Sequence, residues 1–133
     1  MQAIILASPN VKAIDIRKGL AQQNLLIKRK IFKPVLLEAF DLFAIDVLIL
    51  AIRSPDATDI LDFIPEFRRK KFVLSIVVID QAKNEKTAEK CRELGIDGYY
   101  EKPIFYPTFA LRLKNMVCKK QIVCEDRWLK TLS

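Results

Sequence analysis

The sequence predicts an α/β fold in which helices cover both faces of one parallel β-sheet. Three runs are short, continuous, apolar and rich in β-branched residues, as strands buried on both faces are: Ala3 to Ala7, Val47 to Ile52 and Val73 to Ile79. Amphipathic stretches long enough for crossover helices separate these runs. The length of 133 residues suits a single domain, and with only three glycines we expect the whole chain to be ordered.

The first helix and the second strand follow from capping and charge. The helix is expected from about Asn10, a suitable N-cap, to about Gln23. Its buried side would carry Val11, Ile14 and Leu20. The strand Leu25 to Phe32 is interrupted by three charges, Lys28 to Lys30, and lysines protect an exposed sheet edge. We therefore place this strand at the rim of the sheet.

The next three helices are predicted from their prolines, charges and apolar spacing. A second helix should cover Pro34 to about Phe43, with its proline in the first turn. A third follows the loop Ile52 to Asp56 and must break or kink near Pro65, because a proline ring has no N–H to donate inside a helix. The basic run Arg68 to Lys71 ends it, since cations are favoured at a helix C-terminus. The fourth helix, Lys83 to Leu94, is polar, and Gly95 is its natural C-cap. Its thin apolar stripe consists of Ala88, Cys91 and Leu94.

The last third of the chain completes the alternation of strands and helices. A short strand is expected at Gly98 to Tyr100, followed by a helix that starts near Pro107. The core face of that helix would carry Phe109, Leu113, Met116 and Val117. Five strands and five helices are the count of a flavodoxin-like, doubly wound sheet with strand order 2-1-3-4-5, which binds ligands at the carboxyl ends of its strands. Residues 1–120 would form this domain.

Residues 121–133 are predicted to form a C-terminal helical extension. Apolar residues recur there at helical spacing, namely Cys124, Trp128 and Leu132 in one row and Ile122 and Leu129 in a neighbouring row. The extension either continues the last helix as an amphipathic arm or folds back onto the domain, where Trp128 would cover apolar surface.

Two segments resemble the receiver domain of bacterial response regulators, a family that transfers a phosphoryl group to an aspartate. Gly95 to Ile104 resembles the family's glycine-containing turn, fifth strand and lysine-proline loop. Asp46 to Pro55 resembles its third strand and the phosphorylated loop. The resemblance extends to about Lys120 and implies a receiver fold, a role in two-component signal transduction and a cis peptide between Lys102 and Pro103.

The residues that perform receiver chemistry are mostly missing from the matching positions. By the resemblance, Ala51 stands where the phosphoacceptor aspartate should be, and Ala7 and Ser8 stand where an acidic pair should hold magnesium. Magnesium is bound through oxygen ligands that include carboxylates, and phosphoryl transfer needs a positioned nucleophile. We therefore expect a degenerate pseudo-receiver that is not an enzyme and has no catalytic residue, metal or cofactor. A different carboxylate in the pocket, such as Asp56, together with a divalent ion would overturn this.

Three further pocket residues match the late half of the family pattern. The hydroxyl residue of the family falls at about Asp80, its switch aromatic at Tyr99 and its phosphate-contacting lysine at Lys102. Because a lysine in a pocket without other carboxylates needs a counter-charge, Lys102 either pairs with Asp80 or reaches into water. Tyr99 either holds one orientation, responds to a partner instead, or only packs partly against the last helix without a signalling role.

Composition excludes several classes of function. The chain has no histidine, so Ser–His and Cys–His nucleophile pairs and histidine metal ligands are absent. Its three cysteines, at positions 91, 118 and 124, form no C-x-x-C pair, which disfavours zinc and disulfides and predicts small buried or half-buried hydrophobes. No apolar run is long enough to span a bilayer, and the first residues lack the basic start of a secretory signal. We expect a cytoplasmic protein that does not enter a membrane.

These observations predict a signalling module that acts by protein–protein interaction, independently of phosphorylation. Its surface for a protein partner or a second copy of the chain, on the fourth helix, fifth strand and fifth helix, is expected to include Tyr99, Tyr100, Pro103 and Leu113. A net charge of +7, from 23 basic and 16 acidic residues, leaves nucleic-acid association as an alternative. The basic residues cluster at Lys28 to Lys30, Arg68 to Lys71, and Lys119 to Lys120. A small ligand in the degenerate pocket is the remaining alternative.

Overall fold

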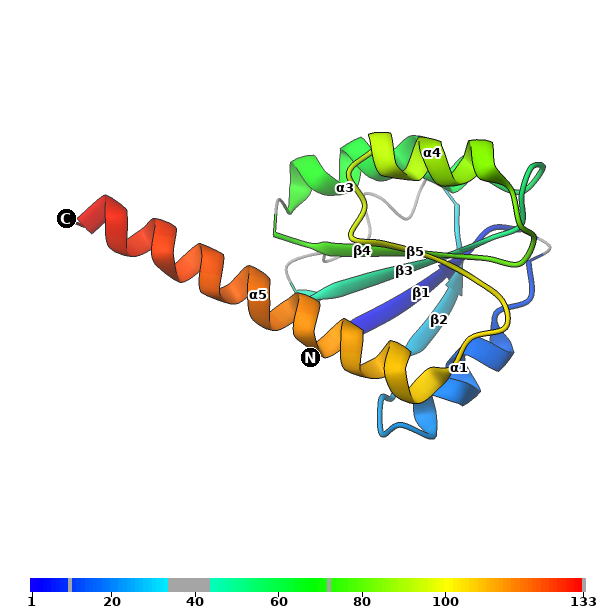
Figure 1. Ribbon diagram of the computed structural model, residues 1–133, viewed down its shortest axis with the longest axis horizontal. Coiled ribbons are helices and arrows are strands. Elements are labelled where there is room, and N and C mark those ends of the chain that lie inside the picture. The colour runs from blue at the N-terminus through cyan, green and yellow to red at the C-terminus, as the bar shows by residue number, and fades with distance from the viewer. Residues whose placement is uncertain (10, 34–43, 72, 133) are drawn as a thin grey trace.

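A five-stranded parallel sheet forms the centre of the computed structural model, which describes residues 1–9, 11–33, 44–71 and 73–132, with side chains described up to Lys120. The strand order is β2-β1-β3-β4-β5, which confirms the predicted order 2-1-3-4-5 (Figure 1). The strands are β1 (Ala3–Ala7), β2 (Lys28–Ile31), β3 (Val47–Ile52), β4 (Ser75–Asp80) and β5 (Gly98–Glu101).

Helices cover both faces of the sheet (Figure 1). The described residues form four α-helices and one short 3₁₀ helix: α1 (Ile14–Ala21), η2 (Asp59–Phe63), α3 (Ile64–Lys70), α4 (Glu85–Glu93) and α5 (Tyr106–Leu132). α1 and α5 pack on one face, whereas η2, α3 and α4 pack on the other. Of the five predicted helices, the second, Pro34 to Phe43, lies outside the described residues.

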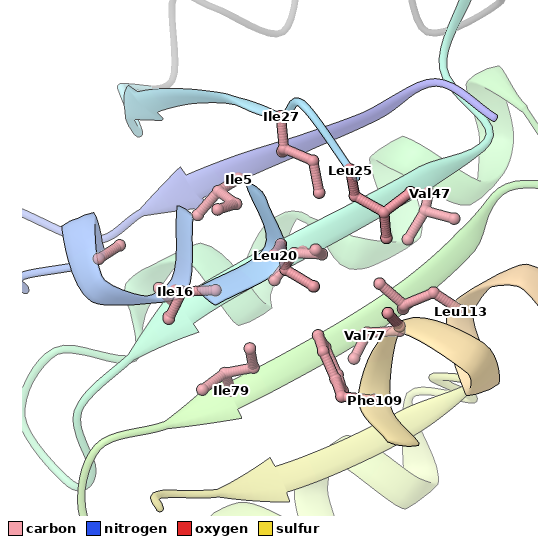
Figure 2. Packing of buried hydrophobic residues seen from close by; sticks show 14 of the residues in the cluster. Ile5, Ile16, Leu20, Leu25, Ile27, Val47, Val77, Ile79, Phe109 and Leu113 are labelled. Carbon is pink, nitrogen blue, oxygen red and sulfur yellow. The ribbon is translucent and has the colours of Figure 1, made fainter. Parts of the chain in front are cut away.

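The three central strands are buried because each is flanked by strands and covered on both faces. All six residues of β3 and all six of β4 are buried, as their continuous apolar runs predict. Figure 2 shows the core on the α1 and α5 side, where β-strand side chains such as Val77 meet Leu20 of α1 and Phe109 of α5. At the rim, all four residues of β2 are exposed, which confirms its placement at the edge of the sheet.

The start of α1 was predicted four residues too early. The helix begins at Ile14 and its N-cap position is Ala13, because the chain first closes a turn in which the N–H of Val11 donates to the carbonyl of Ser8 (3.0 Å). Val11 and Leu20 are buried as expected, but Ile14 lies on the exposed side of the helix. The predicted N-cap, Asn10, lies outside the described residues.

The predicted break near Pro65 takes the form of a change of helix type. The chain runs as a 3₁₀ helix, η2, up to Phe63 and becomes the α-helix α3 at Ile64, so Pro65 lies in the first turn of α3, where no N–H partner is needed. At the end of α4, Gly95 has a φ of +73° and its N–H donates to the carbonyl of Arg92, which confirms it as the C-terminal cap.

The last helix, α5, is continuous from Tyr106 to Leu132. Its first half packs against the sheet, and its second half extends away from the domain instead of folding back (Figure 1). The predicted extension, residues 121–133, therefore begins within a helix and not at a boundary of secondary structure. Among the described residues, no helix combines the length and the apolar composition needed to cross a membrane.

Candidate functional site

The carboxyl edge of the sheet places the predicted pocket residues at the ends of neighbouring strands. In the strand register, Ala51 of β3 lies between Ala7 of β1 and Ile79 of β4. All three are buried apolar residues. The position that matches the receiver phosphoacceptor therefore presents a buried methyl group, which has no atom that can attack phosphorus.

Ser8 follows β1 and has an unpartnered hydroxyl group. Its N–H donates to the carbonyl of Ala51 (3.0 Å), which ties the end of β1 to β3. The residue is only 3% exposed, and its Oγ has no hydrogen-bond partner in the described part of the chain. Within the described ranges, no group of three or more His, Cys, Asp or Glu residues is placed to hold a metal ion.

Asp80 is a fully buried carboxylate at the end of β4. Its Oδ1 accepts hydrogen bonds from the N–H of Ser54 (2.9 Å) and the N–H of Ala82 (3.0 Å). Its Oδ2 accepts from the hydroxyl of Tyr99 (2.6 Å) and from the hydroxyl of Ser54. Four donors therefore compensate the cost of burying this group, and they join β4 to β5 and to the loop after β3.

The predicted ion pair between Lys102 and Asp80 is wrong. The Nζ of Lys102 lies 2.5 Å from Oδ2 of Asp15 in α1, although the backbone N–H of Lys102 does donate to the carbonyl of Asp80 (3.3 Å). A carboxylate has about four acceptor positions, and the donors from Ser54, Ala82 and Tyr99 already use those of Asp80. Lys102 therefore turns neither to the pocket nor to water but to the first helix.

The pairing with Lys102 changes the acidity of Asp15. Partial burial opposes ionisation of this carboxyl, but the hydrogen bond and the positive charge of Lys102 outweigh that effect and hold the pKa of Asp15 below its usual value. The same region is packed closely, because an added methyl group on Gly19 of α1 would lie 2.4 Å from the ring of Tyr106 in α5. α1 is thus joined to the loop after β5 by an ion pair and to the start of α5 by close packing.

Tyr99 is held inward by its bond to Asp80. The ring packs partly against the core on the α3 and α4 side, and burial together with the Asp80 hydrogen bond raises the pKa of Tyr99 well above its usual range. The residue that matches the family's switch aromatic thus donates to a carboxylate that belongs to the protein itself. Its hydrogen bond requires no phosphoryl group.

The cysteines behave differently from one another. Cys91 of α4 is buried, and burial followed by the nearby charge of Asp80 raises its pKa to about 11, so the reactive thiolate is scarce at neutral pH. This confirms the expected buried role for Cys91. The expectation was wrong for Cys118, which is exposed on α5. The side chain of Cys124 lies outside the described residues.

The structure places the residues of the predicted partner surface in different environments. Tyr100 packs against α5, with its ring 5.0 Å from the ring of Phe109 and the guanidinium of Arg112 5.9 Å from its centre. Pro103 is exposed, and the Lys102–Pro103 peptide is cis, as the resemblance implies. Leu113 is 0% exposed, so its assignment to the surface was wrong. It belongs to the α5 row that faces the sheet.

Two large exposed apolar residues, one just before α5 and one on it, were missed. Phe105 precedes α5 and is 73% exposed, and Leu111 on α5 is 59% exposed. The exposure of Leu111 could have been predicted from helical spacing. Leu111 lies two positions before Leu113, which is a rotation of about 200° around a helix and places the two side chains on opposite faces.

A cleft of about 290 Å³ opens beside Ser8 at the carboxyl edge of the sheet. Its lining residues come from the ends of β1 and β2, the loop after β3 and the start of η2: Ser8, Pro9, Phe32, Arg53, Asp56, Ala57, Asp59 and Ile60. Of the predicted pocket residues, Ser8 lines this cleft. Asp56, the alternative carboxylate, lines it too, but with Asp59 it supplies only two carboxylates and Arg53 opposes them. No sequence pattern had indicated Arg53 or Asp59.

Part of the basic surface is engaged within the fold. Arg68 donates to the carbonyls of Leu74 and Gly95 and lies 3.0 Å from Asp97. Lys120 donates to the carbonyl of Leu74 (2.7 Å) and lies 3.1 Å from Asp97. These cations connect α3 and α5 to the amino edge of the sheet. Association with nucleic acid stays a prediction, and one residue in each of two of its basic clusters has this structural role.

Comparison with known proteins identifies the fold. No family model matches the chain, and no curated protein matches it. Among solved structures, a response-regulator receiver domain protein (CheY-like) from Methanospirillum hungatei is 11% identical with a TM-score of 0.69, covering 91% of this chain and 97% of that chain.

Two other structures support the same assignment. A response-regulator receiver domain protein from Clostridium thermocellum is 13% identical with a TM-score of 0.70, covering 92% of this chain and 99% of that chain. HP1043, an orphan response regulator of H. pylori, is 16% identical with a TM-score of 0.66, covering 87% and 96%. At such low identity the likeness concerns the arrangement of the backbone. The chain has the fold of a response-regulator receiver domain.

Proposed function

We propose that this chain is a receiver-like signalling domain that acts by binding a protein partner and does so without phosphorylation. One observation carries the proposal: a buried carboxylate, Asp80, holds the tyrosine at the switch position by a hydrogen bond from its hydroxyl (2.6 Å). The resemblance associates an inward aromatic with a bound phosphoryl group. Here a group of the protein supplies the contact that orients the ring.

The absence of a nucleophile at the phosphoacceptor position supports independence from phosphorylation. Phosphoryl transfer depends on an in-line attacking atom and on neutralisation of charge around the phosphorus. Ala51 supplies no attacking atom, and the lysine at the phosphate-contacting position is paired with Asp15 in α1. Neither residue is arranged to accept or stabilise a phosphoryl group.

The binding surface in this proposal consists of α4, β5 and α5. Contiguous apolar patches on a surface mark interaction sites, and aromatic residues are enriched in interface cores. Phe105 and Leu111 add exposed apolar area before and on α5, and the half-buried Tyr99 and Tyr100 belong to the adjacent strand. Because the Tyr99 hydroxyl is held by Asp80, this face would be kept in one conformation. The first partner to test is a second copy of the chain.

Light scattering during size-exclusion chromatography tests this proposal. The expected result is a concentration-dependent dimer whose mass does not change when magnesium and beryllofluoride are added. Leu111→Ser combined with Phe105→Ser should weaken the dimer by about tenfold or more, since interface energy is concentrated in a few large residues. Ile31→Ser on β2 is the matched control, because Ile31 is an exposed apolar residue at the opposite edge of the sheet.

Two results would contradict the proposal. If the unsubstituted protein is a monomer and its mass is unchanged by all three substitutions, self-association is not its mode of action. A dimer that forms only after addition of beryllofluoride removes independence from phosphorylation.

A further inference from the structure

We propose that the cleft beside Ser8 is a binding site for a small zwitterion, specifically a free amino acid with an apolar side chain. This inference concerns the β1, β2 and η2 side of the domain and does not rest on the function proposed for α4, β5 and α5. The cleft lies at the carboxyl edge of the sheet, where doubly wound folds bind ligands, and its volume of about 290 Å³ suits a compact molecule.

The first argument is the hydroxyl group of Ser8. The side chain is almost fully buried, lines the cleft, and has no hydrogen-bond partner for its Oγ among the described residues. Buried polar atoms in folded proteins are nearly always hydrogen-bonded to protein, water or ligand, so this hydroxyl indicates a missing partner. The Oγ is itself buried, so a rotation of the side chain toward the cleft would bring it to a ligand, where it could donate to a carboxylate or accept from an ammonium group.

The second argument is the pattern of charge around the cleft. Arg53 contributes a guanidinium, and Asp56 and Asp59 contribute two carboxylates. These three residues take part in none of the ion pairs found in the described part of the chain, although Asp62, also in η2, is paired with Lys90 (2.9 Å). Charges of both signs beside one hollow match a ligand with both signs: a carboxylate for Arg53 and an ammonium group for the aspartates.

The third argument is the apolar wall of the cleft. Phe32 and Ile60 are buried residues that line it, together with Pro9 and Ala57. The ring of Phe32 is supported from behind by Phe63, at 5.0 Å between ring centres, and by Phe67, at 6.4 Å. A wall fixed in this way suits an aliphatic side chain. A simple anion or a metal cation would leave the wall and the charge of opposite sign unused.

Leucine and two truncated analogues test this inference by titration into the ¹⁵N-labelled protein. 4-Methylpentanoate lacks the ammonium group, and 3-methylbutylamine lacks the carboxylate. Leucine is expected to shift the amide signals of Ser8, Ala57 and Ile60 in a saturable way, and each analogue should bind about tenfold more weakly or worse, because each leaves one charge unmatched. Magnesium chloride alone should shift none of these signals saturably.

Variants with matched controls locate the site. Arg53→Gln and Asp59→Asn should each weaken leucine binding by about tenfold, since each removes one charged contact. Arg69→Gln and Asp62→Asn should leave it unchanged, because Arg69 is paired with Glu66 and Asp62 with Lys90, away from the cleft lining. Arg69 and Asp62 are thus controls of the same residue types as Arg53 and Asp59.

Three results would overturn the zwitterion site. They are the lack of any saturable leucine shift at these amides, equal binding of leucine and either analogue, and binding that survives both Arg53→Gln and Asp59→Asn. A saturable response to magnesium at the same amides would instead assign a cation site and equally overturn it. None of these results bears on the oligomeric state, so failure here is distinguishable from failure of the proposed function.

Discussion

Replacing Asp80 by alanine is expected to lower the free energy of unfolding by about 3 kcal/mol, because donors left unsatisfied in the interior cost about 1–3 kcal/mol each and some will recover water. The N–H of Ser54, the N–H of Ala82 and two hydroxyls all lose their acceptor. The loss also releases Tyr99, so its ring signals should move toward those of an exposed tyrosine. Tyr99→Phe removes only one donor and should cost about 1 kcal/mol.

Urea denaturation followed by circular dichroism measures this effect. The matched control is Asp62→Ala, which removes an exposed carboxylate paired with Lys90 and should change stability by less than about 1 kcal/mol. If Asp80→Ala proves as mild as Asp62→Ala, or leaves the Tyr99 signals in place, Asp80 does not hold the tyrosine. The structural basis of the proposed function would then be lost.

Leu113→Ala is expected to destabilise the fold by about 3 kcal/mol, because truncating a fully buried leucine loses transfer energy and leaves a cavity. Leu111→Ala, on the same helix, should change stability by less than about 0.5 kcal/mol because its side chain is mostly exposed. The same urea titration compares the two. Equal losses in the two variants would mean that α5 is rotated relative to the sheet from the orientation described here.

This pair of variants also decides how the partner surface should be probed. A loss of binding in a Leu113 variant would report partial unfolding of the core and not a lost contact. Leu111 changes the exposed face of α5 and leaves the buried row intact, so it is the informative position for interaction experiments.

The fold was predictable because burial dominates its local pattern. Val47 to Ile52 and Ile76 to Ile79 are apolar at every position, which is typical of short strands covered on both faces, and the charged run Lys28 to Lys30 indicated an edge. Helix starts were less predictable. The turn after Ser8 delays α1, and the Ser8-Pro9 dipeptide was the turn signal that the helix prediction passed over.

The candidate site was predictable only where a residue is defined by its place on a strand. The resemblance located Ala51, Asp80 and Tyr99, and the strand register put Ala51 beside Ala7. The partners of these side chains depend on contacts between segments far apart in the sequence. Ser54 reaches Asp80 across 26 positions, and Lys102 reaches Asp15 across 87, so one alignment could not reveal either contact.

The cleft beside Ser8 illustrates the same limit. Arg53 and Asp59 carry no motif, and each is an ordinary exposed charge when considered alone. Their juxtaposition with an unpartnered hydroxyl arises only when β1, the loop after β3 and η2 are brought together. Composition restricts the possible chemistry, since a chain without histidine offers few catalytic constellations, but it could not locate a cleft.

We propose that this chain keeps the receiver fold without receiver chemistry, and one amide spectrum provides the decisive test. The ¹⁵N-labelled protein is recorded before and after addition of magnesium and beryllofluoride, which mimics an aspartyl phosphate. We predict no specific, saturable change at Ala51, Tyr99 or Lys102, because no carboxylate is available at Ala51 to bind the mimic. Saturable shifts centred on Ala51 and Lys102 would show that the site still binds a phosphoryl mimic and would contradict this proposal.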